Sequence, residues 1–450
     1  MVYSMKSAKN HPLVIGTLIL TLTGLLSRVI GFFYRIYLSR LFGEEGMGLY
    51  QLLSPVLSVS FSLTAAGYQT AISKLVAEQA AAAKTPSLRP MAVGMAFSLP
   101  LSLLCNAVLY FFAEPVATVL LQEPRTAGML RILSFSVPLS AVHSCVNGYF
   151  YGIKKAGIPA VSQLLEQLTR VGCVYIASAS YLAEGGLPPI QIAVLGLTVG
   201  ELFSMLYSAA AIWQQGCRVK AFCPAPIHGL SPALCKSLLA TALPLTANRI
   251  VLNLLQSVES VSIPSRLRLY GYDNVTALSV YGVLTGMAMP FIFFPNALTS
   301  SVAVLLLPLI SENYALGNYD AVRRATVKTV RYCGLMGVCC MAGFVGLGRW
   351  AGTTLFHSPL SGYFITTLGF ICPFLYLDTT LSSILQGLGK AGHIFFMNVA
   401  CLLLRLAFVF LAVPRFGIAG YLWGLLASQL TLGVLYLTCL YRLLKKMPAA

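Results

Sequence analysis

Long apolar stretches recur along the whole chain and limit its possible folds more than any other feature. A helix of about 20 mainly apolar residues is long enough to span the hydrocarbon core of a bilayer. The 450-residue sequence contains twelve such stretches, at residues 12–33, 46–66, 91–112, 128–149, 157–182, 188–213, 236–260, 277–306, 326–348, 362–386, 392–412 and 417–441. The eighth stretch is long and contains Pro290 and Pro295, which predict a kink. We therefore predict an all-α integral membrane protein with about twelve transmembrane helices.

The charged residues agree with a membrane protein. They make up 10% of the chain, whereas roughly 25% is usual in a soluble domain. The net charge is +17, but the lysines and arginines stand singly between apolar stretches, which argues against a nucleic-acid partner. With the N-terminus in the cytosol, most of them fall in cytosolic segments, as the positive-inside rule requires. The sequence thus predicts a multi-pass protein of the plasma membrane with both termini in the cytosol.

The first apolar stretch is not interpreted as a cleavable signal peptide. It continues past Arg28 to Phe33, and no small-residue cleavage site follows it. We expect it to remain as the first transmembrane helix.

The reactive side chains form no catalytic pattern. Most of the 12 cysteines lie inside apolar stretches without a zinc-type pair. No Gly-rich phosphate loop and no HExxH motif occurs. The longest predicted extramembrane segment has about 24 residues, which is shorter than the roughly 50 residues of a small domain. We therefore expect no enzyme, no catalytic site, no metal site and no cofactor, apart from a coupling Na⁺ or H⁺.

An internal repeat relates the two halves of the chain. At one offset of 235 residues, matched Leu, Phe, Pro, Gly, Lys and Ala residues align segments 133–138 and 152–157 with segments 368–373 and 387–392. The same offset pairs Arg170 with Arg405 and His143 with Asp378. Chance similarity between apolar helices explains matched Leu and Phe but poorly explains matched Pro, Gly, Lys and Arg. We predict two six-helix lobes, 1–225 and 226–450, related by a pseudo-two-fold axis along the membrane normal.

Polar residues inside the first and seventh spans suggest a binding site. On an insertion scale a charge near the bilayer centre costs about 2.5–3.5 kcal/mol, so such residues normally face a cavity or a partner. Arg28 and Arg35 lie seven residues apart and share one face of the first span. The seventh span carries a polar stripe with helical spacing, composed of Thr246, Arg249, Asn253, Gln256 and Ser260.

We interpret Arg28 and Arg249 as lining a central cavity, because guanidinium groups suit phosphate oxygens. The alternative is that the arginines pair with Glu201, Glu259 or Asp378 and only hold helices together. The candidate substrate-binding residues are Arg28, Arg249, Arg35, Asn253, Gln256 and Arg405.

A second set of titratable residues suits either ion coupling or a structural polar network. Glu166 precedes Arg170 by four residues on the fifth span, which is the favoured order for an intrahelical salt bridge. Gln163 and Gln167 lie on the same stripe. The lone histidine of the fourth span suits helix packing, and Asp378 suits a coupling cation or a proton. The full set is Glu166, Arg170, Glu201, Asp378 and His143.

Several short motifs, in this order and spacing, resemble one family of transporters. They are SRVIGF at 27–32, SRLFG at 39–43, GMGLYQ at 46–51, AISKLVAE at 71–78, GYFYG at 148–152 and QGLGK at 386–390. The chain resembles the multidrug/oligosaccharidyl-lipid/polysaccharide (MOP) exporter superfamily over nearly its whole length. Within that superfamily it is similar to the polysaccharide biosynthesis branch and its sporulation proteins, and the motif around Arg28 looks like the basic first helix of lipid II flippases.

The resemblance implies a two-lobed, V-shaped, MATE-like transporter without enzymatic activity. Its expected substrate is a polyprenyl-diphosphate-linked sugar such as lipid II, a peptidoglycan precursor, carried across the plasma membrane by alternating access. The other expected partners are membrane lipid and the cell-wall synthesis machinery, with the protein acting as a monomer. Many relatives in this branch have fourteen helices, so twelve helices leave open how the lipid tail is handled.

Three other functions fit parts of the sequence. A cation-coupled multidrug exporter of the same superfamily would have a cavity of acids and aromatic residues. A membrane glycosyltransferase would need a sizeable extracytoplasmic loop bearing acids, which the sequence lacks. A structural protein of the division or sporulation machinery would have no cavity between its lobes.

Overall fold

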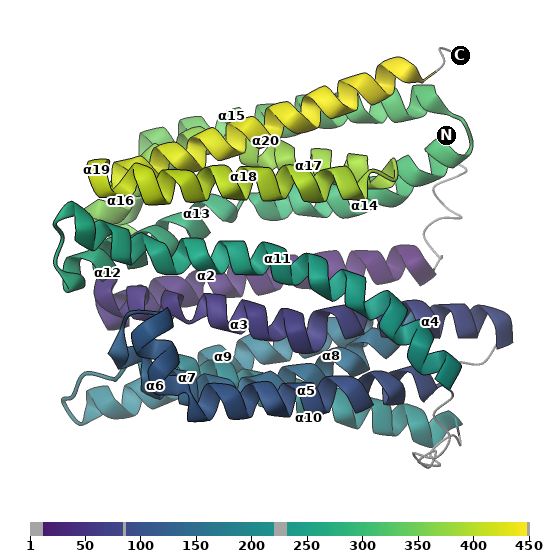
Figure 1. The fold of residues 1–450 in the computed structure, drawn as a ribbon, viewed down its shortest axis with the longest axis horizontal. Coiled ribbons are helices and arrows are strands. Elements are labelled where there is room, and N and C mark those ends of the chain that lie inside the picture. Colours follow the sequence, from purple (N-terminus) through teal and green to yellow (C-terminus); the bar gives the residue numbers. More distant parts are fainter. Residues whose placement is uncertain (1–11, 84–86, 220–231, 448–450) are drawn as a thin grey trace. The chain divides into compact units, whose positions relative to one another are not determined.

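The computed structural model describes residues 12–83, 87–219 and 232–447, and every regular element within these ranges is helical (Figure 1). Eleven helical segments are long and apolar enough to cross a membrane. The predicted all-α membrane fold is therefore confirmed. Contacts divide the chain into two compact units, which we describe in turn.

The eleven segments differ from the twelve predicted spans in three places. The first two predicted spans form one continuous segment, Thr21–Ala80. The eighth is divided into Asn274–Phe293 and Asn296–Ala315, so the kink predicted from the prolines is confirmed as a break at Pro295. The fifth is α9 (Gly157–Ala183), a helix that is absent from the eleven because its polar stripe lowers its hydropathy. The count of twelve stays a prediction.

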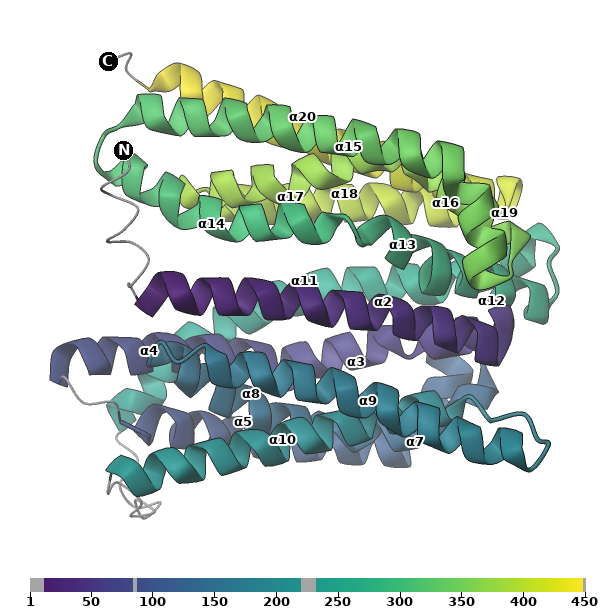
Figure 2. The same ribbon diagram turned by 180° about the vertical axis from the view of Figure 1, so that it is seen from behind.

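The first unit comprises the described residues up to Gly31 and Leu52–Leu254. It contains the N-terminal parts of two long helices, α2 (Pro12–Leu52) and α11 (Pro232–Tyr270). Between them lie α3 (Ser54–Phe61), the π-helical turn η1 (Ser62–Ala66), α4 (Gly67–Ala83), α5 (Arg89–Phe111), α6 (Ala113–Pro115), η2 (Val116–Leu120), η3 (Pro124–Thr126), α7 (Ala127–Ser134), α8 (Ser136–Gly152), α9 (Gly157–Ala183) and α10 (Gln191–Val219). Figure 2 shows α8, α9 and α10 lying side by side.

The GYFYG motif at the end of α8 contributes large side chains to the core of the first unit. Tyr149 and Phe150 are buried against Ile72 and other apolar residues of α4. The flanking glycines let the two backbones approach, since a Cβ atom on Gly148 would lie 2.6 Å from the carbonyl oxygen of Gln69. The motif therefore combines two large core side chains with two glycines that let α4 pack closely against α8.

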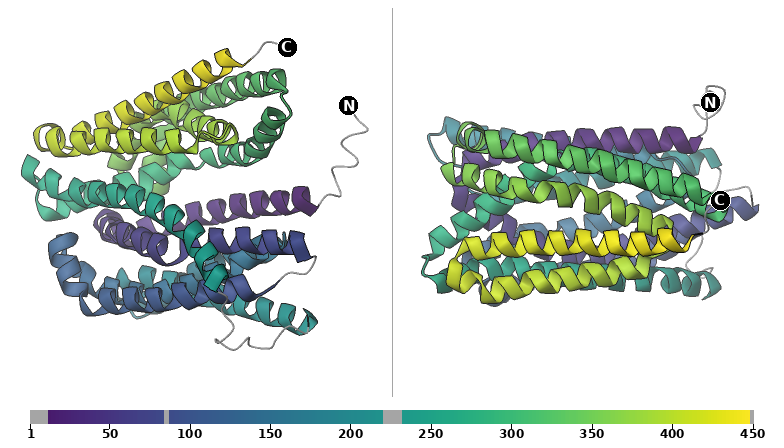
Figure 3. Two further views of the ribbon diagram at one scale, coloured as in Figure 1. Left: turned by 45° about the vertical axis from the view of Figure 1, so that its right-hand side comes forward. Right: turned by 90° about the horizontal axis from the view of Figure 1, so that it is seen from above.

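The second unit comprises Phe32–Gln51 and the described residues from Leu255 onward. It contains α12 (Asn274–Gly282), the π-helical turn η5 (Val283–Ala288), α13 (Met289–Phe293), α14 (Asn296–Ala315), α15 (Tyr319–Phe356), α16 (Pro359–Leu368), η6 (Gly369–Ile371), α17 (Cys372–Gly387), α18 (Ala391–Leu411), α19 (Val413–Phe416) and α20 (Ile418–Lys446). Its core joins α14, α15, α17, α18 and α20 around Leu381 and Tyr436, and α18 and α20 lie side by side in Figure 3.

The two units interleave along the sequence because α2 and α11 each contribute to both. The C-terminal part of α2 packs on α12 in the second unit, where Gly48 approaches the backbone at Leu278. The N-terminal part of α11 packs on α4 in the first unit, where Ala242 lies in the same core cluster as Ile72. The predicted boundary between residues 225 and 226 lies outside the described residues, and the lobe division and its symmetry axis stay predictions.

The contact at Gly48 predicts a large effect of one methyl group. A Cβ atom at this position would overlap the carbonyl oxygen of Leu278, so Gly48→Ala should destabilise the protein by about 1–3 kcal/mol. The control is Gly24→Ala on the same helix, where a Cβ atom meets nothing within 4 Å. Thermal unfolding of the purified protein in detergent should show a lower Tm for Gly48→Ala alone. Equal Tm values for both variants would contradict this packing.

Candidate functional site

Arg28 and Arg249 are the two exposed basic residues at the centre of the predicted site. Arg28 lies on α2 and Arg249 on α11, and both side chains are exposed. Within the described part of the chain, neither guanidinium makes a hydrogen bond or an ion pair. Both residues belong to the first unit, whereas Arg35 is half-buried and belongs to the second. Both guanidiniums are therefore exposed and have no polar partner among the described residues.

Some residues of the polar stripe on α11 pack against other helices, and others are exposed. Thr246 is buried against Gly67, because a Cβ atom on Gly67 would overlap the Oγ1 atom of Thr246. The Asn253 amide Nδ2 donates hydrogen bonds to the carbonyl oxygen of Ser58, at 3.2 Å, and to the hydroxyl of Ser62. Gln256 is exposed, like Arg249. Thr246 and Asn253 thus fasten α11 to the first unit and leave Arg249 accessible.

Arg405 has a partner inside the second unit. Its Nη2 donates to Glu259 Oε2 of α11 at 2.6 Å, and the Tyr421 hydroxyl donates to Glu259 Oε1 at 2.8 Å. The Glu259 carboxylate is buried. For Arg405, this geometry corresponds to the alternative in which an arginine pairs with a carboxylate and holds helices together. No local sequence signal indicated Tyr421, because it lies 162 residues from Glu259.

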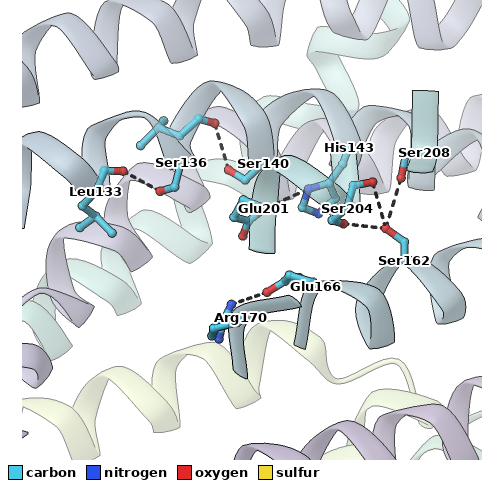
Figure 4. Close-up of polar contacts among 11 residues, drawn as sticks. Leu133, Ser136, Ser140, His143, Ser162, Glu166, Arg170, Glu201, Ser204 and Ser208 are labelled. Carbon is cyan, nitrogen blue, oxygen red and sulfur yellow. Dashed lines mark hydrogen bonds and ion pairs between the residues drawn. The ribbon is translucent and has the colours of Figure 1, made fainter. Parts of the chain in front are cut away.

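Four titratable residues of the first unit meet on α8, α9 and α10 (Figure 4). His143 Nδ1 lies 3.1 Å from Glu201 Oε2. Glu166 and Arg170 form the ion pair expected from their spacing, and Glu166 interacts electrostatically with both His143 and Glu201. With His143 protonated, the four groups carry two positive and two negative charges. With His143 neutral and both carboxylates ionised, the cluster has one negative charge in excess.

Three serines beside this cluster were not anticipated from the sequence. The Ser162 hydroxyl lies 2.7 Å from that of Ser204 and 3.2 Å from that of Ser208, which ties α9 to α10 (Figure 4). Ser204 and Ser208 are four residues apart on one helical face, and this spacing is the one sequence signal that could have indicated them.

Asp378 is a buried acid of the second unit. Its side chain is buried on α17, and neither carboxylate oxygen has a hydrogen-bond partner among the described residues. A Cβ atom on Gly433 of α20 would lie 3.1 Å from Oδ1, so the absence of a side chain there makes room for the carboxylate. An ionised carboxylate buried without a partner is costly. The repeat pairs Asp378 with His143 by position, but their surroundings differ in charge.

The chain is similar to known membrane proteins over most of its length. Residues 13–314 match the model of the polysaccharide biosynthesis protein family. Stage V sporulation protein B of Bacillus subtilis (strain 168) is 29% identical over 427 residues, which cover 94% of this chain and 82% of that protein. Lipid II flippase MurJ of the same organism is 23% identical over 407 residues, which cover 85% of this chain and 74% of that protein.

Solved structures show the same fold at low sequence identity. An inward-facing multidrug resistance MATE family transporter of the MOP superfamily has a TM-score of 0.73 at 15% identity, covering 94% of this chain and 96% of that chain. Lipid II flippase MurJ in an inward closed conformation has a TM-score of 0.72 at 14% identity, and the match covers 94% of this chain and 87% of that chain. The chain is thus a multi-pass membrane protein with a MATE-like fold, as predicted. The matched model covers well over half of the sequence, so the chain belongs to the polysaccharide biosynthesis protein family.

Proposed function

We propose that this protein is a flippase that moves a polyprenyl-diphosphate-linked sugar, such as lipid II, across the plasma membrane by alternating access. The observation that carries the proposal is the pair of exposed guanidiniums, Arg28 and Arg249, on two membrane helices without partners among the described residues. The names of relatives, a lipid II flippase among them, support the choice of substrate. No bond is made or broken in this reaction.

The charge of the substrate explains the need for arginines. A diphosphate has multiple negative charges, and moving it bare through hydrocarbon would be prohibitive. Arg28 and Arg249 offer bidentate contacts to its oxygens. Because both arginines belong to the first unit, we propose that this unit holds the diphosphate. Arg405 is better assigned to its ion pair with Glu259.

Reconstitution in liposomes tests the proposal directly. Purified full-length protein is inserted into vesicles that contain a labelled polyprenyl-diphosphate sugar, and the share of label reachable from outside is followed over time. We expect faster exchange between leaflets than in vesicles without protein. An exchange rate equal to that of empty vesicles, with correctly inserted protein, would overturn the proposal.

The leading alternative is a cation-coupled multidrug exporter of the same superfamily. It is favoured by the buried carboxylate of Asp378, which has no hydrogen-bond partner in the described part of the chain, and by the fold shared with a multidrug transporter. The same vesicles distinguish the two functions, since an exporter would accumulate a cationic dye under an imposed Na⁺ or H⁺ gradient. Dye accumulation without sugar-lipid exchange would favour the exporter.

We further propose that Asp378 binds the coupling Na⁺ or H⁺, because a cation or a proton would neutralise its buried carboxylate. Asp378→Asn keeps the size and removes the charge. We expect the acceleration of flipping by a Na⁺ or H⁺ gradient to fall by about 5–150-fold, the usual range of coupling between sites. The measurement is the flipping rate in vesicles with and without each gradient.

The matched control for this variant is Glu312→Gln, which also converts an acid to its amide but at an exposed position. It should retain the full response to the gradient. If Asp378→Asn responds as the parent does, the coupling site lies elsewhere. The cluster around His143 is then the next candidate.

A further inference from the structure

A cluster of basic residues lies where the N-terminal end of α15 meets the C-terminal end of α20 in the second unit. Figures 1 and 2 show these two helix ends side by side. Val322 of α15 and Leu440 of α20 belong to one buried cluster, and Arg323 Nη2 donates to the carbonyl oxygen of Leu444 at 3.3 Å. Six basic residues at this end are exposed: Arg323, Arg324, Lys328, Arg331, Arg442 and Lys445. We refer to these six residues as the basic cluster.

The basic cluster has no acidic partner among the described residues, whereas two other basic residues on the predicted cytosolic side have an acidic or an amide partner. Lys74 lies 3.9 Å from Glu78, and Lys155 donates to Gln215 at 2.9 Å. Within the described residues, no member of the basic cluster forms an ion pair. Asp320 is the one acid in residues 319–334, and residues 437–447 contain none. The positive-inside rule requires positive charges on the cytosolic side of the membrane. It does not require them to be clustered or to lack acidic partners.

Large apolar side chains continue the same helix faces toward the middle of the helices. Tyr332 and Leu335 lie four residues beyond Lys328 and Arg331, and they are 67% and 61% exposed. On α20, Tyr441 is 68% exposed next to Arg442. The 38-residue α15 is about 57 Å long at 1.5 Å per residue, which exceeds the roughly 30 Å of the hydrocarbon core. Its basic end therefore reaches the headgroup region while its apolar part stays in lipid.

We propose that the basic cluster binds the headgroup of an anionic phospholipid across the ends of α15 and α20. The cations match a phosphate, and the adjoining exposed apolar side chains match acyl chains, so the surface fits an amphiphile better than a soluble phosphate. The headgroup would bridge the two helices at the point where Arg323 already links them. This inference is independent of the flippase proposal, and either can fail without the other.

Native mass spectrometry of the purified full-length protein in detergent tests the proposal. The probes are phosphatidylglycerol and phosphatidylcholine with the same acyl chains, at equal concentration. Near a charged surface each Lys or Arg contributes about 1 kcal/mol, so we expect phosphatidylglycerol to be retained at least about fivefold better. Equal retention of the two lipids by the parent protein would overturn the proposal.

Matched triple variants locate the site. Arg324→Gln/Lys328→Gln/Arg331→Gln should abolish the preference for phosphatidylglycerol. The control triple Lys74→Gln/Arg89→Gln/Lys236→Gln removes the same charge from exposed residues of the first unit and should keep it. An equal loss in both triples would show a non-specific effect of net charge and overturn the proposal. Displacement of phosphatidylglycerol by soluble glycerol 3-phosphate would identify a free-phosphate site instead of a lipid site.

Discussion

Replacing Arg28 or Arg249 by alanine should slow the flipping of the lipid-linked sugar by about 10–100-fold, because each guanidinium contributes charge-assisted hydrogen bonds of about 1.5–3 kcal/mol. Charge reversal in Arg28→Glu should reduce the rate further, since a carboxylate repels the diphosphate. Arg249→Lys should restore part of the rate, because lysine supplies the charge without the planar fork. The measurement is leaflet exchange of the labelled sugar-lipid in reconstituted vesicles.

The control for charge reversal is Arg89→Glu. Arg89 is exposed at the start of α5, outside the proposed binding stripe, so this variant should flip at the parental rate. Expression and insertion have to be equal for all variants. If the alanine variants also flip at the parental rate, Arg28 and Arg249 do not bind the substrate, although the protein could still be a flippase that uses other residues.

Local sequence patterns predicted those features whose partners are close along the chain. The pair Glu166–Arg170 follows from a spacing of four residues, and the break at Pro295 follows from the chemistry of proline. The spans were found because about 20 apolar residues suffice to cross a bilayer. These features depend on one helix at a time.

Contacts between segments that are far apart along the chain could not be predicted from local sequence patterns. The first predicted span ended at residue 33, but α2 continues to Leu52 with a kink at Gly43. Beyond residue 33, Arg40 donates to the carbonyl oxygens of Leu355 and Thr354 at 2.9 and 3.0 Å, at the end of α15 more than 300 residues away. Arg40 thus satisfies carbonyl groups that a helix end leaves free. The sequence alone shows the arginine but not the two carbonyl groups that accept its hydrogen bonds.

The exposure of Arg28 and Arg249 likewise required the structure. The stripe on α11 has a regular spacing, and this spacing does not show which of its five members are packed and which are exposed. Packing separates them, since Gly67 admits Thr246 and the backbone at Ser58 accepts from Asn253. Arg249 and Gln256 are the stripe residues that remain exposed. The sequence therefore predicted the candidate residues, and tertiary contacts divided them into packing residues and available ones.

Removing the carboxylate of Glu259 should cause the largest loss of stability of any variant described here. Breaking a buried ion pair by removing one partner costs about 3–5 kcal/mol, because the other charge stays buried without compensation. In Glu259→Gln, the Arg405 guanidinium would lose its acceptor at 2.6 Å, and the Tyr421 hydroxyl would lose a charged one. We expect a clearly lower Tm in thermal unfolding of the purified protein in detergent.

A second substitution separates a structural role of Arg405 from substrate binding. In Glu259→Gln/Arg405→Gln no uncompensated charge remains, so part of the lost stability should return, because the cost of removing one partner comes from the buried charge that is left. Arg405→Gln alone should lower the Tm in a similar way to Glu259→Gln. If instead Arg405→Gln leaves the Tm unchanged but slows flipping as strongly as Arg28→Ala, then Arg405 is a substrate ligand.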